Sequence, residues 1–208
     1  MDKLVVEVGL LLGENVEKYE KVLEDNGAVN VFNCETHDLY WTNKTHRELE
    51  KLTENQIKNA CVRLRICSGV GGKEFNGNYD VSMSFDNFKI YDEKKDDRFK
   101  VDMKKFKQIQ KKLEDDGWYL VFDTFKRDNQ YTIDDMKSRI QLQDIDTIGV
   151  LLYYDNPDYY GLDEETQRVR LIEELNSYGF DFKKEDLGVD KLRTLLLGHT
   201  CYSKNQNG

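Results

Sequence analysis

The sequence predicts an α+β protein in which antiparallel strands form a sheet and helices pack outside it. Short segments rich in branched and aromatic residues recur along the chain, and several alternate apolar with polar residues, as half-buried strands do. Between them lie three longer stretches with apolar residues at helical spacing, each followed by a glycine. We expect residues 1–198 to form a single domain and residues 199–208 a polar C-terminal tail, because no stretch resembles a linker.

The first half of the chain is expected to hold one helix and six short strands. The helix, Glu14–Asn26, places its apolar residues on one face and ends at Gly27. The strand segments are Leu4–Leu12, Val29–Phe32, Asp38–Trp41, Ala60–Cys67, Tyr79–Phe85 and Phe88–Tyr91. A polar segment spans Asn43–Asn59, and the run Glu93–Lys100 is so charged that we expect a solvated loop there.

The second half is expected to hold three helices and the remaining strands. One helix is centred on Phe106 and Ile109 and closes at Gly117, a second covers Glu164–Tyr178, and a short one covers Val189–Leu197. The strand segments are Tyr119–Phe125, Gln130–Ile133, Lys137–Ile145, Val150–Tyr154 and Phe180–Phe182.

Two stretches of the chain resemble each other closely. Leu23–Ala28 reads LEDNGA and Leu113–Trp118 reads LEDDGW, and in both cases a Val-Phe pair follows seven residues before an aspartate. A repeated helix–glycine–strand unit favours a pseudo-symmetric sheet. The alternative is chance use of a common helix-ending pattern.

The charge balance limits the kinds of partner. The chain has 31 basic and 40 acidic residues, a net charge of −9, which argues against a broad nucleic-acid or membrane surface but leaves room for a small basic pocket. The longest apolar runs are far shorter than the roughly 20 residues of a membrane span. The four cysteines form no CxxC pair, so we expect free thiols in a reducing cytoplasm.

The strand Ala60–Cys67 presents two arginines on one side. Because side chains alternate along a strand, Arg63 and Arg65 share a face opposite Val62 and Leu64. Taken alone, this is typical of the solvated face of an antiparallel strand. Because strand after strand has one polar and one apolar face, a closed barrel with a polar interior that binds a charged ligand is the other interpretation.

Several motifs occur in an order that resembles a known family. They are an acidic first strand, an Asp-x-Tyr strand (His37–Trp41), an ALRLR-like strand (Cys61–Arg65), a basic segment ending in tyrosine (Lys126–Tyr131), a strand pair (Ile140–Gly149 and Val150–Asp155) and a last helix with paired leucines (Lys191–Leu196). Their order resembles a CYTH domain, the triphosphate tunnel metalloenzyme superfamily of class IV adenylyl cyclases and thiamine and inorganic triphosphatases. The resemblance spans about residues 3–198. It implies an eight-stranded, tunnel-like antiparallel β-barrel.

The resemblance also implies two acidic pairs that hold Mg²⁺ or Mn²⁺, and here this chain departs from the pattern. Carboxylates suit such ions because they supply both oxygen ligands and charge. Glu7 and Asp155 match, whereas the other positions of the pattern carry Gly9, Leu11, Tyr153 and Gln143. The basic positions are better kept. The expected anion-binding residues are Arg63, Arg65, Lys126, Arg127 and Arg139.

These matches predict a CYTH-like protein that binds a nucleotide or polyphosphate-type anion in a basic tunnel with weak or no metal-dependent catalysis. Arginine and lysine grip phosphates through charge-assisted hydrogen bonds, whereas phosphoryl transfer needs metal ions that two carboxylates would hold weakly. One alternative is an active Mg²⁺- or Mn²⁺-dependent triphosphatase or adenylyl cyclase acting on ATP, thiamine triphosphate or tripolyphosphate. A second is a non-catalytic protein-interaction module.

Overall fold

The structure is a computed structural model that describes residues 8–13, 15–70, 79–82, 98–133, 139–183 and 189–198, without the side chains of 68–70, 79–82 and 98–99. The helices are α1 (Val16–Asp25), α2 (His46–Leu49), α3 (Glu54–Ala60), α4 (Met103–Asp115), α5 (Glu164–Ser177) and α6 (Lys191–Leu197), with one 3₁₀ turn, η2 (Pro157–Tyr159). The strands are β1 (Val8–Gly13), β2 (Val29–Thr42), β3 (Cys61–Val70), β4 (Tyr79–Ser82), β5 (Arg98–Val101), β6 (Tyr119–Thr132), β7 (Ile140–Ile145) and β8 (Gly149–Tyr154).

The strands confirm the α+β class. They are hydrogen-bonded in the order β1-β8-β7-β6-β2-β3-β4-β5. The pairs β1–β8, β7–β8, β2–β3, β3–β4 and β4–β5 are antiparallel. Within the described residues this order ends at β1 and β5, which is the pairing of an open sheet. Closure into an eight-stranded tunnel therefore stays a prediction.

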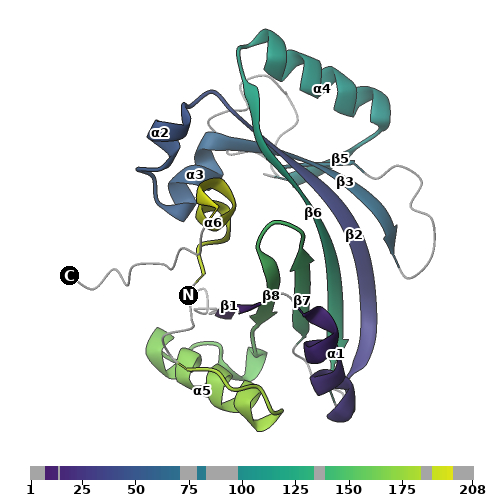
Figure 1. The fold of residues 1–208 in the computed structure, drawn as a ribbon, viewed down its shortest axis with the longest axis vertical. Helices are drawn as coiled ribbons and strands as arrows, with labels where there is room; N and C mark the ends of the chain where they lie inside the picture. Colours follow the sequence, from purple (N-terminus) through teal and green to yellow (C-terminus); the bar gives the residue numbers. More distant parts are fainter. Residues whose placement is uncertain are drawn as a thin grey trace. The chain divides into compact units, whose positions relative to one another are not determined.

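The chain divides into two compact units. The first comprises Met1–Asn33, Arg127–Val189 and Tyr202–Gly208, and the second comprises Cys34–Lys126 and Asp190–Cys201. Strands β2 and β6, drawn as the two longest arrows in Figure 1, each contribute residues to both units.

The core of the first unit lies between its strands and the helices α1 and α5. Its fully buried side chains come from alternate positions of β1, β7 and β8: Val8, Leu10, Ile140, Leu142, Val150, Leu152 and Tyr154. The helices supply Val16 and Leu23 from α1 and Leu171 and Leu175 from α5. This alternation explains why the strands fold as they do, since each turns one apolar face toward the helices.

The second unit has two apolar clusters. Helix α4 packs Phe106, Ile109 and Leu113 on the sheet face that carries Trp41, Val62 and Leu64, and Figure 1 shows α4 lying over these strands. The short helices α2, α3 and α6 form the other cluster, around the side chains Tyr40, Leu49, Ile57, Cys61, Leu192 and Leu196. The apolar residues of β3 therefore lie under α4, and its arginines belong to the opposite face.

Two long strands of the structure, β2 and β6, were each predicted as a pair of short strands. The predicted segments Val29–Phe32 and Asp38–Trp41 lie within the 14-residue β2. In the same way, Tyr119–Phe125 and most of Gln130–Ile133 lie within the 14-residue β6. The mostly polar residues between the predicted segments suggested a break in each strand. Every second one of them is instead buried on a polar face of the sheet, and the strand continues through them.

The predicted strand Phe180–Phe182 is not a strand. The side-chain amide of Asn176 hydrogen-bonds both backbone groups of Phe182. Its Nδ2 donates to the Phe182 carbonyl at 2.9 Å, and its Oδ1 accepts from the Phe182 N–H at 2.8 Å. The rings of Phe180 and Phe182 stack, with centroids 5.3 Å apart. A side-chain amide thus satisfies backbone groups that a ladder would otherwise pair.

Two polar segments also differ from expectation. The stretch Asn43–Asn59 contains α2 and all of α3 except its last residue, and the end of the expected loop Glu93–Lys100 begins β5. The predicted strand Phe88–Tyr91 and the tail 199–208 lie outside the described residues. Among the helices that are described, none is long and apolar enough to span a membrane.

Candidate functional site

A buried polar face lies on β2, β3 and β6 within the second unit. On β2 the even-numbered positions from 34 to 42 are all buried, and they include Asp38. In the antiparallel register, Asp38 is directly opposite Arg65 on β3, and Tyr40 is opposite Arg63. From β6 the alternate positions Thr124 and Lys126 are buried. The two sequence motifs Asp-x-Tyr and Arg-x-Arg therefore meet as register partners.

Asp38 and Arg65 form a bidentate ion pair at the centre of this face. Arg65 Nε donates to Asp38 Oδ1 at 2.6 Å, and Arg65 Nη2 donates to Oδ2 at 2.8 Å. Lys126 Nζ lies 3.8 Å from Asp38 Oδ2. Asp38 is 1 %, Lys126 6 % and Arg65 8 % exposed, so this face of β3 is not a solvated outer face.

Burial and charge act in opposite directions on Asp38. Burial by itself would raise the pKa of the carboxyl, because it penalises the charged form. The hydrogen bond from Arg65 and the charges of Lys126, Arg65 and Arg63 outweigh that penalty and hold the pKa of Asp38 at about 2. Asp38 is consequently ionised at neutral pH and serves as a fixed negative charge among three cations.

Tyr40 stays protonated next to this ion pair. Burial raises the pKa of its hydroxyl, and the charge of Asp38 raises it further. The guanidinium of Arg63 hydrogen-bonds the Tyr40 hydroxyl and opposes that rise without overcoming it. The Tyr40 ring stacks on Phe122 from β6, with centroids 4.5 Å apart. Each arginine is thus oriented by the residue opposite it on β2.

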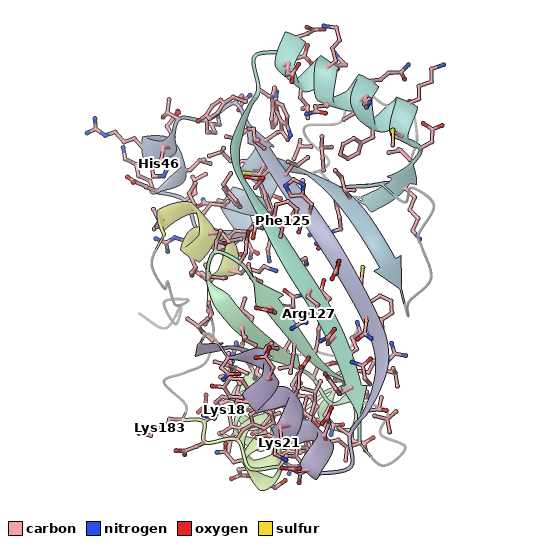
Figure 2. The ribbon with its side chains drawn as sticks, turned by 45° about the vertical axis from the view of Figure 1, so that its right-hand side comes forward. Lys18, Lys21, His46, Phe125, Arg127 and Lys183 are labelled. Carbon is pink, nitrogen blue, oxygen red and sulfur yellow. The ribbon has the colours of Figure 1, made fainter. Side chains whose placement is uncertain are left out.

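Two other residues expected to bind the anion belong to the first unit. Arg127 follows Lys126 in β6 and so belongs to the other face of that strand. Its Nη2 lies 3.4 Å from Asp144 Oδ2, and its side chain, labelled in Figure 2, is 42 % exposed. Arg139 is exposed, and its Nη1 donates to Gln130 Oε1 at 3.2 Å. The structure brings Arg63, Arg65 and Lys126 together around Asp38, and it gives Arg127 and Arg139 other partners.

Of the two expected metal ligands, the structure describes Asp155, which belongs to the first unit. Asp155 directly follows β8 and accepts a hydrogen bond from the Tyr160 hydroxyl. Glu7 lies outside the described residues. In the register of β1 and β8, Gly9 is opposite Tyr153. A Cβ placed on Gly9 would lie only 3.2 Å from Tyr153 Cε1, so the tyrosine ring occupies the space beside the glycine.

The described side chains on this part of β1 and β8 do not fit a pair of divalent ions. Such ions need several oxygen ligands, whereas Gly9 and Tyr153 offer a bare backbone and an aromatic ring. Leu11 and Leu151, the next pair in the same alternation, are aliphatic. Throughout the described segments, no group of three or more histidine, cysteine, aspartate or glutamate side chains could hold a metal ion.

Sequence reasoning missed the roles of Asp38 and Tyr40. Both belong to a motif of the resemblance, and neither was expected to contribute to the site. The signal that could have indicated them is the shared period of two: an Asp-x-Tyr strand can place both side chains opposite an Arg-x-Arg strand on one face.

The comparisons with known proteins bear on the fold. No family model and no curated protein matches the sequence. Among solved structures, HpAC1 of Hippeastrum, a proposed adenylyl cyclase with a dominant triphosphatase activity, has a TM-score of 0.55 at 11 % identity, over 94 % of this chain and 97 % of that one. A protein of Pyrococcus horikoshii OT3 named PH1819 has a TM-score of 0.53 at 15 % identity, over 86 % of this chain and 90 % of that one. The chain therefore shares its fold with a proposed adenylyl cyclase, which confirms the resemblance to the CYTH fold.

Proposed function

We propose that this protein binds a phosphate-rich anion, a nucleoside triphosphate or an inorganic polyphosphate, on the polar face formed by β2, β3 and β6. The observation that carries the proposal is the convergence of Arg63, Arg65 and Lys126 around Asp38 on a buried strand face. Guanidinium groups match phosphate oxygens with a rigid fork of donors, and lysine adds a compact point charge.

A buried hydroxyl on the same face supports a ligand there. Thr36 lies two residues before Asp38 in β2 and is 3 % exposed. Its Oγ1 makes no hydrogen bond among the described residues. Because buried hydroxyls are normally hydrogen-bonded, an anion or an ordered water is the expected partner of Thr36.

The tunnel belongs to this proposal. In a closed barrel, the polar faces of successive strands would line one interior, and a phosphate-rich ligand would be surrounded by cations instead of water. The protein would act in the cytoplasm, where cysteines such as the buried Cys61 would stay reduced.

We expect turnover to be weak or absent. Phosphoryl transfer of this kind relies on metal ions to neutralise developing charge and to position the attacking oxygen. Positions that would need carboxylates carry Gly9 and Tyr153. Asp155 already accepts a hydrogen bond from Tyr160. Without carboxylates to hold metal ions, the arginine and lysine side chains can bind a triphosphate and still leave it intact.

Isothermal titration with ATP, thiamine triphosphate and tripolyphosphate tests the proposal. We expect binding of at least one of them, and a loss of at least about tenfold in affinity for Arg63→Met and for Lys126→Met, because each removes a charge-assisted contact. Lys107→Met is the matched control, since it removes one positive charge from the exposed side of α4 in the same unit. No binding of any ligand, or equal affinity in all variants, would contradict the proposal.

An active triphosphatase is the second candidate, because HpAC1, which shares the fold, has a dominant triphosphatase activity. In such an enzyme, Asp155 and Glu7 would be the metal ligands, and Arg63, Arg65 and Lys126 would hold the phosphates. Phosphate release from tripolyphosphate with Mg²⁺ or Mn²⁺ measures this activity directly. Turnover that disappears with EDTA and in Glu7→Ala would support the enzyme over the binding protein. Turnover that persists under both conditions would exclude this mechanism.

A further inference from the structure

The Asp38 side chain interacts with all three cations of the described site. It accepts both hydrogen bonds from Arg65, it lies 3.8 Å from Lys126, and it interacts electrostatically with Arg63. A carboxylate that engages a guanidinium in this bidentate way makes the same contacts as a phosphate would make. Asp38 therefore contacts the same donor groups that a bound phosphate would contact.

We propose that Asp38 is a built-in counter-ion that holds Arg65 and Lys126 in place before the ligand arrives and then sets the affinity by competing with the bound anion. This inference rests on the proposed function, since it concerns the same cations. It assigns Asp38 as a positioning residue with a second, opposing effect: it orients the donors and also repels the ligand.

The positioning effect follows from the cost of burying charge. Arg65 and Lys126 are almost fully buried, and cations taken out of water need a nearby negative charge. Asp38 supplies that charge from the strand directly opposite Arg65, so the register of β2 and β3 fixes where the guanidinium lies. The ligand-free site is therefore preorganised.

The competing effect depends on the charge of the ligand. A bound phosphate chain must approach the cations that surround Asp38 and so lies near its carboxylate. Coulomb repulsion grows with the number of charges on the ligand and is weakly screened at a buried site. Asp38 should thus weaken tripolyphosphate binding more than pyrophosphate binding.

The variant Asp38→Asn removes the charge and keeps the shape of the side chain. We expect its affinity for tripolyphosphate to rise by about tenfold and its affinity for pyrophosphate to rise less. Without ligand, its melting temperature should fall, because Arg65 and Lys126 have lost the carboxylate charge that Asp38 supplies. A merely structural aspartate would lower the melting temperature and leave the ratio of the two affinities unchanged.

The double variant Asp38→Asn/Lys126→Met covers the case in which the single variant does not fold. It removes one negative and one positive charge, so the site keeps the formal charge that it has in the wild type. We expect it to fold and to bind tripolyphosphate within about threefold of the wild type, whereas Lys126→Met alone binds more weakly. Lys107→Met again controls for an overall charge change.

The experiment is titration of tripolyphosphate and pyrophosphate into these four variants and the wild type at one ionic strength, with thermal melts in parallel. If the wild type binds tripolyphosphate and Asp38→Asn binds it equally or more weakly, the counter-ion role is wrong while the proposed function stands. If the single variant does not fold, a double variant that binds as weakly as Lys126→Met overturns the counter-ion role in the same way. If no protein binds either ligand, the proposed function fails and this inference fails with it.

Discussion

Two segments of the molecule are built alike and carry different chemistry. Helix α1 leads through Gly27 into β2, and helix α4 leads through Gly117 into β6. Both glycines have a positive φ, 77° and 80°. In both segments, the N–H of the residue after the glycine returns to the carbonyl of a leucine in the last turn, at 2.9 Å for Leu23 and 2.8 Å for Leu113. Both strands have 14 residues.

The difference lies in what surrounds one aspartate. Asp38 and Asp128 occupy the same position in the two strands, and both are buried, at 1 % and 5 % exposure. Asp38 meets a guanidinium and an ammonium group. Asp128 accepts a hydrogen bond from the neutral amide of Gln141, at 3.2 Å. The repeated segment thus supplies a common scaffold, and what distinguishes Asp38 is its bidentate ion pair with Arg65 of the partner strand β3.

The largest difference in stability between the two segments is expected when the partner of each aspartate is removed. Arg65→Met leaves Asp38 buried with its bidentate partner gone, so we expect the free energy of unfolding to fall by about 3–5 kcal/mol. Gln141→Met removes one hydrogen bond from Asp128 and should cost about 1–2 kcal/mol. Urea denaturation followed by circular dichroism measures both values. Equal losses would mean that the two aspartates are equivalent after all.

Acid should act through Asp38. Its pKa is lowered from 3.8 to about 2 in the folded protein, so the folded state favours the ionised form. The resulting stabilisation, about 2 kcal/mol, is fully present above the unfolded pKa and is lost as the pH falls through about 2. We expect the stability difference between the wild type and Asp38→Asn to be constant above about pH 5 and to shrink below pH 4. A difference that stays constant down to pH 2 would show that the charge of Asp38 does not stabilise the fold.

The repeat itself could be predicted from the sequence, and so could the face that carries the arginines. The motif LED followed by an amide or acid and glycine recurs at the ends of α1 and α4 because both helices need a residue with positive φ after the last turn. The alternation of Arg63 and Arg65 with Leu64 fixes their shared face once β3 is recognised. Alternation also places Arg127 on the face opposite Lys126, so the expectation that both bind one anion conflicted with a period of two.

Other features depend on information that local patterns do not hold. The pairing of Asp38 with Arg65 joins residues 27 positions apart, and the register between two strands is set by packing and by the connection between them. The helices α2 and α3 were missed in a polar stretch, although Thr45 with Glu48 and Thr53 with Gln56 are complete capping boxes. The two capping boxes could therefore have been recognised in the sequence.

The two glycines should respond alike, which sharpens the comparison. An added Cβ at Gly27 or Gly117 would have no atom within 4 Å, so only the backbone conformation is at stake. Alanine at a left-handed position costs about 1–2 kcal/mol, and we expect Gly27→Ala and Gly117→Ala to lower the free energy of unfolding equally within that range. Asparagine tolerates this conformation better and should cost less at both sites. Unequal losses would indicate that the two helix ends are not structurally equivalent.

The smallest effect is expected at a pair of surface ion pairs that the repeat also shares. Lys21, labelled in Figure 2, contacts Asp25 at 2.8 Å on α1, and Lys111 contacts Asp115 at 2.9 Å on α4. In each pair, the hydrogen bond and the charge of the aspartate raise the pKa of the lysine. Both pairs are exposed and screened by salt, so Lys21→Ala and Lys111→Ala should leave the urea midpoint unchanged within error. A clear loss for only one of them would show that the equivalence of the two segments does not extend to their exposed ion pairs, although the glycine geometry at the two helix ends is matched.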